Sequence, residues 1–541
     1  MIGLIPSRRG FRSLSSLGII PMRTWLVSGS LAGVLFLIAP PLASSRSAIH
    51  WVSEDRSGRL VYRSLPRGDR IVDFSYAGYG AGCVLLPRVR AAVTLSPSGG
   101  DDSAAIQHAI DQVSSLRLQD DTRGAVVLGP GTFHASATLR IEASGVVLRG
   151  SGTGPAGTTL ELTGEPHLAV AVGGQEQIQP VGTVAHIAEG YVPSGAQSIA
   201  VDNTSEIAPG DTIRITRGVT SAWLHFMGMD HMARNGKPET WVGNSISTLR
   251  TITAREGNVL RLDVALTDSY DRQYLPPEGA AVSRVLVTGR IEQDGIEDMH
   301  IVAPARTVAL SAPLFRAIRF DDLRDGWARN LLIDDTTEGV EAGGGASRVT
   351  IEDVSIRHTT AVTSPAKPAD FSLSGTQILL LRCSSVGNNL FYVVTGARNQ
   401  GPNVVLDSRF LGDGHVQPHQ RWSTGLLIDN TQVPQGGIDM MNRGEMGSGH
   451  GWTMGWGVVW NSSAATLVIQ NPPGSSNWSI GTSGLEETAP MKIYDGPHGN
   501  QGPDLPQGFI ESPGQRVAPA SLYRAQLRDR LGEIALQALN P

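Results

Sequence analysis

Residues 349–359 read VTIEDVSIRHT, and this short stretch of alternating apolar residues with an acidic residue near its turn decides the fold. Similar units recur along the chain: IEDMHIVAP (296–304), ARNLLIDDT (328–336), ILLLRCSSVGN (378–388), VVLDSRFLGD (404–413) and LLIDNTQV (426–433). Alternation of this kind predicts β-strands. The units begin roughly 22–32 residues apart, a period typical of a solenoid in which each coil of parallel strands buries its face on the next. The sequence therefore predicts an all-β fold, a parallel β-helix.

The first coil of this solenoid is preceded by a predicted helix. Residues 96–116, SPSGGDDSAAIQHAIDQVSSL, place Ser103 or Asp102 at the N-cap, and Ile106, Ile110 and Val113 recur at helical spacing. Residues 124–152, GAVVLGPGTFHASATLRIEASGVVLRGSG, then predict three short strands, each ended by glycine. Such a helix covers the end of a solenoid and protects the exposed strand edge.

This opening resembles that of the pectate-lyase-like superfamily, the right-handed, single-stranded parallel β-helices with the pectin lyase fold. The matching residues are Gly100, Asp101, Asp102, Ala105, Ile106, Ala109 and Ile110, then Val127, Gly129, Pro130, Gly131 and Phe133, then Val147, Leu148, Gly150 and Gly152. The resemblance implies the fold. It does not choose the chemistry, because hydrolases, lyases, epimerases and phage tailspikes share these motifs.

Changes in composition and in strand pattern along the chain divide it into six predicted segments. They are an export signal (1–48), an N-terminal β cap (49–96), the first coils (97–196), a small β insertion with a long loop (197–290), the main β-helix with the site (291–482), and a C-terminal tail and helix (483–541). The C-terminal helix is expected to carry Leu527, Leu531 and Ile534 on one apolar stripe.

Export is predicted from the first segment. Residues 24–40 form an apolar run that is short for a membrane span, and small residues follow in 41–48. Ser7–Phe11, SRRGF, resembles a twin-arginine signal, whereas a start at Met22 would leave an ordinary Sec-type signal. We expect a periplasmic or extracellular protein whose mature chain has no membrane span. Its two cysteines, Cys83 and Cys383, either pair or stay as buried thiols.

The net charge of the chain limits which classes of ligand it can bind. The net charge of -6 excludes a general nucleic-acid-binding surface. The basic residues are nearly all arginine, and the planar guanidinium suits carboxylates, so an acidic ligand bound locally stays open. A GC-rich genome that favours arginine codons explains the same bias equally well.

Residues 413–481 gather the candidate catalytic residues. His419 and Arg421 are two residues apart and would face the same side of a strand. An imidazole as proton acceptor beside a guanidinium that holds a carboxylate suits β-elimination on a uronic acid. His450, a coil or two later, is the expected partner acid or base. We therefore predict a polysaccharide lyase with His419, Arg421 and His450 as catalytic residues. The alternative is structural: His419 and His415 would bond loop backbone, and Arg421 would bridge neighbouring coils.

The same stretch supplies candidate substrate-binding residues: His415, Trp422, Trp452, Trp456, Asn461, Asn477 and Trp478. Tryptophan faces next to glycine can stack on sugars, and asparagines can bond hydroxyls. Packing in the core is the alternative for the tryptophans, and turn formation is the alternative for the asparagines.

Two other functions remain open at this point. One is a glycoside hydrolase, which needs paired carboxylates such as Asp429, Asp439 or Glu445; the other is a non-catalytic carbohydrate-binding or surface-structural β-helix. Gly449-His450-Gly451 matches one element of the polygalacturonase pattern, but no Arg-x-Lys follows it. The glycan, endo or exo action, and the oligomeric state, with a trimer as one option, are not determined by the sequence.

Metal binding is not assigned to any residue. Calcium stays open as a cofactor, because family members use it and an acidic patch exists at Asp334, Asp335, Glu338, Glu341, Glu352 and Asp353. In the insertion loop, a lid over the groove is one role open to His225, Asp230 and His231, and their spacing does not match a known metal motif.

Overall fold

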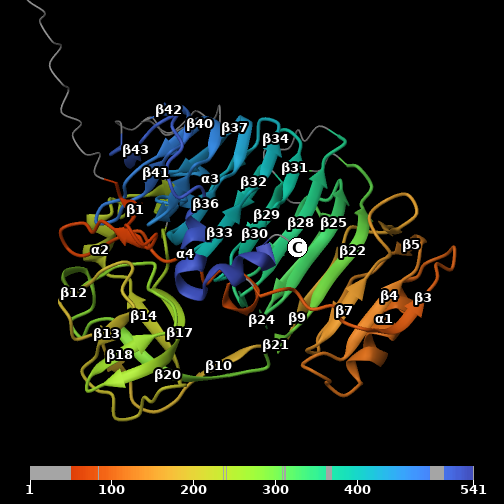
Figure 1. Cartoon of the computed structure of the whole chain (residues 1–541), viewed down its shortest axis with the longest axis horizontal. Coiled ribbons are helices and arrows are strands. Elements are labelled where there is room, and N and C mark those ends of the chain that lie inside the picture. The colour runs from red at the N-terminus through yellow and green to blue at the C-terminus, as the bar shows by residue number, and fades with distance from the viewer. Residues whose placement is uncertain are drawn as a thin grey trace, which may run out of the picture. The chain divides into compact units, whose positions relative to one another are not determined.

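Parallel pairing between successive coils organises the chain (Figure 1). The structure is a computed structural model that describes residues 50–82, 84–234, 237–238, 240–306, 309, 312–360, 368–487 and 505–539. The predicted export signal and Cys83 lie outside these residues. The described part forms a right-handed parallel β-helix, so the predicted fold class is confirmed.

One strand of each coil pairs with the equivalent strand of the next. This ladder runs through β3 (Ala91–Leu95), β4 (Gly124–Leu128), β7 (Val146–Arg149), β22 (Gly295–Val302), β25 (Trp327–Asp334), β28 (Thr350–Arg357), β30 (Leu379–Leu381), β33 (Gln400–Leu406), β36 (Ser423–Asp429), β39 (Val458–Trp460), β41 (Trp478–Ile480) and β43 (Phe509–Glu511). The six repeated sequence units occupy successive rungs, which confirms the solenoid period.

A second ladder closes the coils on another side. It runs through β6 (Leu139–Ile141), β9 (Leu168–Gly173), β23 (Arg316–Asp321), β26 (Glu338–Ala342), β29 (Ala369–Leu373), β32 (Phe391–Val394), β35 (His415–Val416), β37 (Gln432–Met440), β40 (Ser463–Ile469) and β42 (Ser483–Glu487). The inward-facing residues of both ladders form one continuous apolar core from Val126 to Ile469. Burial of this core is the main stabilising contribution to the fold.

Helix α1 (Ser103–Ser114) covers the first coils as expected (Figure 1). Asp102 occupies the N-cap position, and Ile106, Ile110 and Val113 are buried against the core. The predicted capping helix is confirmed.

The insertion is an antiparallel sheet placed between two consecutive coils. Its strand order is β10 (Gln177–Pro180), β20 (Ala281–Thr288), β14 (Thr212–Gly218), β17 (Ser245–Glu256), β18 (Val259–Leu262) and β13 (Ser198–Ala200). The sheet reaches back to Gln177, upstream of the predicted boundary at 197, because β10 and β11 (Ala185–His186) pair with β20. The β-helix is not interrupted, since β22 after the insertion pairs directly with β7 before it.

Residues 49–96 are expected to form an N-terminal cap, but their first two strands lie elsewhere. Strands β1 (Val52–Glu54) and β2 (Leu60–Tyr62) lie beside the late coils, where the Trp51 ring is 5.8 Å from that of Trp478 and 4.5 Å from that of Phe509. The late coils carry an apolar outer face, and Trp51 and Phe74 are buried on it. Only β3 pairs with the first coil.

Helix α4 (Leu522–Leu531) covers the same outer face. Leu527 is buried, but Leu531 and Ile534 are 45% and 73% exposed, so the expected three-residue stripe is not formed. The helix ends at Gly532, whose φ of 82° redirects the chain before Ile534. No helix among the described residues is long and apolar enough to span a membrane. Cys383 is a buried thiol, and burial raises its pKa.

A buried carboxylate fastens α4 to the coils. Asp429 accepts hydrogen bonds from the Ser521 hydroxyl at 2.7 Å and from the Tyr523 amide at 2.9 Å. Burial raises the pKa of Asp429 from 3.8 to about 7, and the two hydrogen bonds only partly oppose this shift.

We expect Asp429→Asn to change the pH dependence of stability. A raised folded pKa means that the folded chain binds the proton more tightly than the unfolded chain, so this contribution is full below about pH 4 and is lost as pH rises through about 7. The free energy of unfolding of the wild type should therefore fall relative to that of the variant between about pH 4 and pH 7, with a slope of at most about 1.4 kcal/mol per pH unit, and its melting temperature should fall with it.

Thermal unfolding of both proteins, followed by circular dichroism, measures this difference. Glu142→Gln, which changes an exposed carboxylate, should leave the pH profile as it is in the wild type. Parallel profiles for the wild type and Asp429→Asn would contradict the assignment.

Candidate functional site

The three predicted catalytic residues come together on successive coils. The Arg421 amide donates to the His450 carbonyl at 3.1 Å, and the His419 and His450 rings lie 4.7 Å apart between centroids. We call His419, Arg421, His450 and the neighbouring Arg443 the histidine–arginine cluster. His419 and Arg421 do not lie on one side of a strand as predicted, because residues 417–422 form the connection between β35 and β36.

His419 lies in an environment that disfavours protonation. Its ring contacts Phe391 edge to face, with 5.1 Å between centroids, and Arg443 Nη1 donates to its carbonyl oxygen at 2.7 Å. Burial, followed by the positive charge of Arg443, lowers the pKa of His419 to about 3. The imidazole is therefore neutral near pH 7, with one ring nitrogen able to accept a proton.

Arg421 is held by the turn that contains Ser448. Its Nη2 donates to the Ser448 carbonyl at 2.5 Å and to the Ser448 hydroxyl at 2.9 Å. Arg421 and Trp422 both have positive φ, 57° and 61°, which is costly for residues other than glycine. The surrounding structure must enforce this conformation, which occurs at tight turns as well as at functional sites and is also found in this chain at Asp120 and Asp121.

Arg443 and Trp241 belong to this site but are not predicted from the sequence. Arg443 is buried at 2% exposure, and its only sequence signal is a single basic residue between Asn442 and Gly444 in the same stretch. Trp241 comes from the insertion loop, and its Nε1 donates to the His450 carbonyl at 3.0 Å. No regular spacing in the sequence links Arg443 or Trp241 to the predicted catalytic residues.

The insertion loop docks onto the cluster through tryptophans. Trp223 of α2 (Ser221–Phe226) stacks on Trp241 at 5.3 Å, and both rings meet Trp422 edge to face. Trp452 Nε1 donates to the Met227 carbonyl at 3.0 Å. These contacts hold the insertion loop against the late coils.

Trp422 also lines a small pocket of about 210 Å³ beside the cluster. Aromatic, basic and acidic side chains meet there: Arg67, Tyr191, Arg217, Trp223, Phe226, Asp268, Asp271 and Tyr274. Trp422 Nε1 donates to Asp268 Oδ2 at 3.0 Å, and Phe226 stacks on Tyr274 at 4.2 Å. Flat rings next to hydrogen-bonding groups suit a sugar ring.

The remaining predicted substrate-binding residues are enclosed. His415 binds Asp439 at 2.7 Å, and Trp456 and Trp478 pack under the N-terminal segment. Asn461 exchanges hydrogen bonds with Val517, and Asn477 bonds backbone groups of neighbouring coils. Trp452 is 3% exposed within the loop interface. These contacts favour the structural alternative for all six residues.

A larger groove of about 970 Å³ lies between the insertion sheet and the turns of the β-helix. Its charged lining residues are Arg214, Arg250, Arg284, Arg290, Arg324, Arg348 and Arg398 against Glu176, Asp211, Asp263 and Glu292. Arg284, Arg290, Arg324 and Arg348 form ion pairs with carboxylates. The buried Arg250 donates instead to Thr248 and to backbone carbonyls. Arg214 and Arg398 have no carboxylate partner within the described ranges. We call this the arginine groove.

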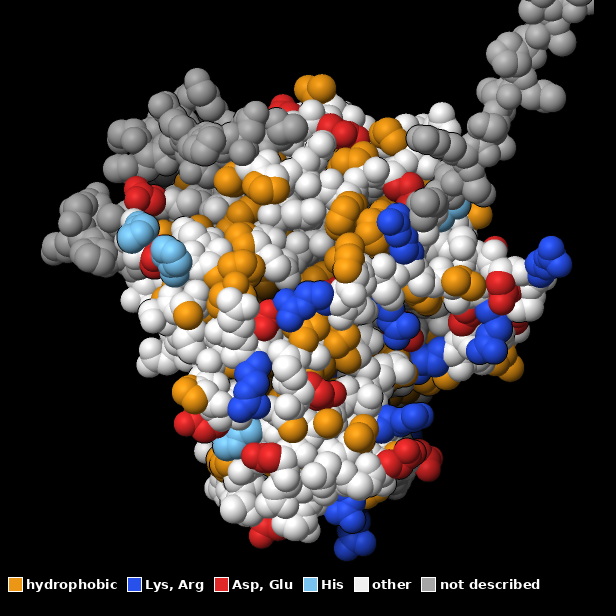
Figure 2. Space-filling view, turned by 90° about the vertical axis from the view of Figure 1, so that its left-hand side faces the viewer, with side chains coloured by type: hydrophobic (Ala, Val, Ile, Leu, Met, Phe, Trp, Pro, Cys, Tyr) orange, Lys and Arg blue, Asp and Glu red, His pale blue; other side chains and the backbone are white. Residues whose placement is uncertain are grey.

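The arginine groove leads toward the cluster. The Arg398 amide donates to the Arg421 carbonyl at 2.8 Å, so Arg398, Arg421 and His450 occupy adjacent positions on three successive coils. Elsewhere, basic and acidic side chains are interspersed, as Figure 2 shows for the side that carries β1, α2 and β12.

The carboxylates that are candidates for hydrolysis or for calcium binding make contacts with other groups of the protein. Asp429 is enclosed below α4, and Asp439 accepts from Gln417 as well as binding His415. Glu445 is exposed. In the acidic patch, Asp334 pairs with Arg357, Glu338 with Arg316, and Asp353 with Arg382.

Neither known protein-family models nor curated protein sequences match this chain. Distant likenesses to solved structures exist. A double mutant of the tailspike protein of E. coli bacteriophage HK620, in complex with a pentasaccharide, is 12% identical over 82% of this chain and 63% of that chain, with a TM-score of 0.38. The chain thus spans less than two thirds of that protein.

Two further tailspikes are similarly distant. That of Acinetobacter baumannii bacteriophage AP22, in complex with A. baumannii capsular saccharide, is 10% identical over 76% and 71% of the two chains, with a TM-score of 0.25. That of Pseudomonas phage phi297 is 12% identical over 70% and 73%, with a TM-score of 0.24. The fold assignment therefore rests on the strand pairing of the chain itself.

The position of His419 predicts that its ring does not titrate near neutrality. Histidine-selective labelling and nuclear magnetic resonance should show one imidazole that stays neutral from pH 8 down to about pH 4, because burial and Arg443 oppose its protonation. His419→Ala identifies the signal by its loss. A midpoint near 6.5 for that signal would contradict the described environment.

Proposed function

We propose that this chain is an exported protein that binds an acidic polysaccharide and cleaves it by β-elimination. The observation that carries the proposal is the convergence of His419 with the His450 ring, 4.7 Å away, and with two arginines; burial and Arg443 lower the pKa of His419 and favour its neutral imidazole. Elimination on a uronic acid needs a base, a proton donor and positive charge at the carboxylate, and this cluster contains side chains for all three roles.

The reaction can be written with these side chains. Arg421 and Arg443 hold the uronate carboxylate and stabilise the negative charge that develops when the C5 proton leaves. His419 takes that proton, the C5–H electron pair forms the C4–C5 double bond, and the C4–O bond breaks. His450, as the imidazolium, donates a proton to the departing oxygen, and proton exchange with solvent then restores both histidines. The products are a new chain end with a hydroxyl and an unsaturated uronic acid.

The low basicity of His419 also fits an anionic substrate. A pKa of about 3 makes the free imidazole a weak base. A carboxylate bound near Arg443 offsets the charge that contributes to this low pKa, so the substrate itself increases the basicity of His419. The arginine groove supplies further positive charge for neighbouring uronates.

Binding without cleavage is the second candidate function. The same low pKa favours it, because an imidazole that stays weakly basic cannot remove the C5 proton at a useful rate. The arginine groove and the aromatic pocket beside Trp422 would then serve for glycan recognition alone.

A panel of polyuronides distinguishes these functions. We expect the chain to generate ultraviolet absorbance from an unsaturated product, and His419→Ala to lower kcat about 10²–10⁴-fold because the base is lost. Arg421→Ala should cause a comparable loss, whereas His134→Ala, which alters a histidine of an early coil, should leave kcat unchanged.

Other results of this assay would indicate a different function. New reducing ends without ultraviolet absorbance would indicate hydrolysis, and retention of the polymer without cleavage would indicate binding alone. Elimination that persists unchanged in both His419→Ala and Arg421→Ala would exclude the histidine–arginine cluster as its site.

The groove generates a separate prediction about affinity. Arg214→Ala and Arg398→Ala should each raise KM or Kd for an acidic polysaccharide about tenfold or more, because charge-assisted hydrogen bonds to uronates are lost. Arg409→Ala, which removes an exposed arginine of β34 (Arg409–Leu411) outside the groove lining, is the matched control. Equal affinities for all three variants and the wild type would show that the glycan binds elsewhere.

A further inference from the structure

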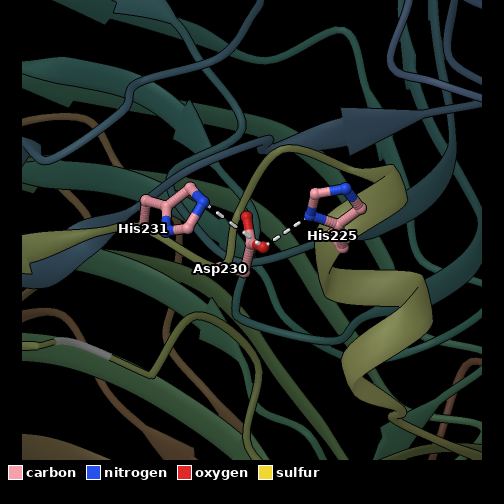
Figure 3. A group of neighbouring side chains, drawn as sticks. All are labelled: His225, Asp230 and His231. Atoms are coloured by element: carbon pink, nitrogen blue, oxygen red, sulfur yellow. Dashed lines mark hydrogen bonds and ion pairs between the residues drawn. The ribbon is translucent and has the colours of Figure 1, made fainter.

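Three side chains of the insertion loop converge at the molecular surface (Figure 3). His225 Nδ1 lies 2.7 Å from Asp230 Oδ2, and His231 Nε2 lies 3.6 Å from the same oxygen. One ligand atom from each residue lies within 4.8 Å of the others. The two imidazoles are largely exposed and the Asp230 side chain is 25% exposed, so solutes can reach them.

The backbone brings these residues together although their spacing in sequence matches no familiar metal motif. Helix α2 ends next to Met227, and Gly228, with a φ of 66°, reverses the chain. The Gly228 amide donates to the His225 carbonyl at 3.0 Å, and the Met229 amide donates to the Leu224 carbonyl at 2.9 Å. This hydrogen-bonded turn presents Asp230 and His231 back toward His225.

The donor set has a clear chemical preference. Two imidazole nitrogens and one carboxylate oxygen are ligands that Zn²⁺ accepts, and three protein ligands leave a fourth tetrahedral position open. Calcium and magnesium prefer all-oxygen sites and fit this set poorly. A cation between the three groups would also replace the surface ion pairs, which by themselves stabilise little.

We infer that His225, Asp230 and His231 bind Zn²⁺ and thereby fasten the end of α2 to the loop that follows it. The site is close to contacts that fix the loop on the β-helix. The Met227 carbonyl accepts from Trp452 Nε1, and Trp241, later in the same loop, bonds the His450 carbonyl. Metal binding would therefore stabilise the loop above the histidine–arginine cluster. This inference does not depend on any catalytic activity of that cluster.

Isothermal titration of the tag-free, EDTA-dialysed full chain with Zn²⁺ tests the site. We expect about one ion per chain, and a loss of affinity of about tenfold or more in His225→Ala, Asp230→Asn and His231→Ala, since each removes one of three ligands. His186→Ala is the matched control: this histidine of the same insertion has one carboxylate neighbour, Asp202, at 3.5 Å, and its variant should bind as the wild type does.

A second measurement tests the role of the ion. Zn²⁺ should raise the melting temperature of the wild type and slow proteolytic cleavage between residues 219 and 244, and it should do neither in the His225→Ala/His231→Ala double variant. Because these side chains are exposed, circular dichroism should show that the double variant is folded. Wild-type affinity that is no higher than that of the double variant would overturn the site. Tight binding without any change in melting temperature or cleavage would overturn the loop-fastening role.

Discussion

The parallel backbone hydrogen bonds between successive coils are the constraint on which the other features depend. They let β22 pair with β7 although the whole insertion lies between them in sequence. They also place Arg398, Arg421 and His450 on adjacent coils, where main-chain bonds of 2.8 and 3.1 Å join them. Residues more than twenty positions apart thereby become neighbours, and Arg398 of the arginine groove is joined through its backbone to Arg421 of the histidine–arginine cluster.

Much of the fold could be predicted from the sequence, because strand alternation and coil period are local signals. The repeated units, the capping helix with Ile106, Ile110 and Val113, and the presence of a β insertion follow from such signals. The course of the N-terminal segment does not. Trp51 packs on Trp478 and Phe509, and no local pattern links residues that far apart. For the same reason, the exposed positions of Leu531 and Ile534 depend on a helix end at Gly532 that periodicity alone does not show.

The site could be predicted in part. Sequence clustering identified His419, Arg421 and His450, and the coil stack brings them together. Composition could not separate a tryptophan at the edge of a pocket from one in a closed core, because both rings have the same chemistry and every described tryptophan is buried. Trp422 lines a pocket, whereas Trp456 and Trp478 lie under the N-terminal segment. Arg443 and the convergence of His225, Asp230 and His231 depend on turns and loop docking, which leave no periodic signal.

A crystal structure of the His419→Ala variant with a bound acidic oligosaccharide tests the central claim most directly. The variant should hold the ligand without turning it over. The account predicts a uronate carboxylate within hydrogen-bonding distance of Arg421 or Arg443, with the following sugars lying along the arginine groove past Arg398. An oligosaccharide bound on another face of the β-helix, with no carboxylate at either arginine, would contradict it.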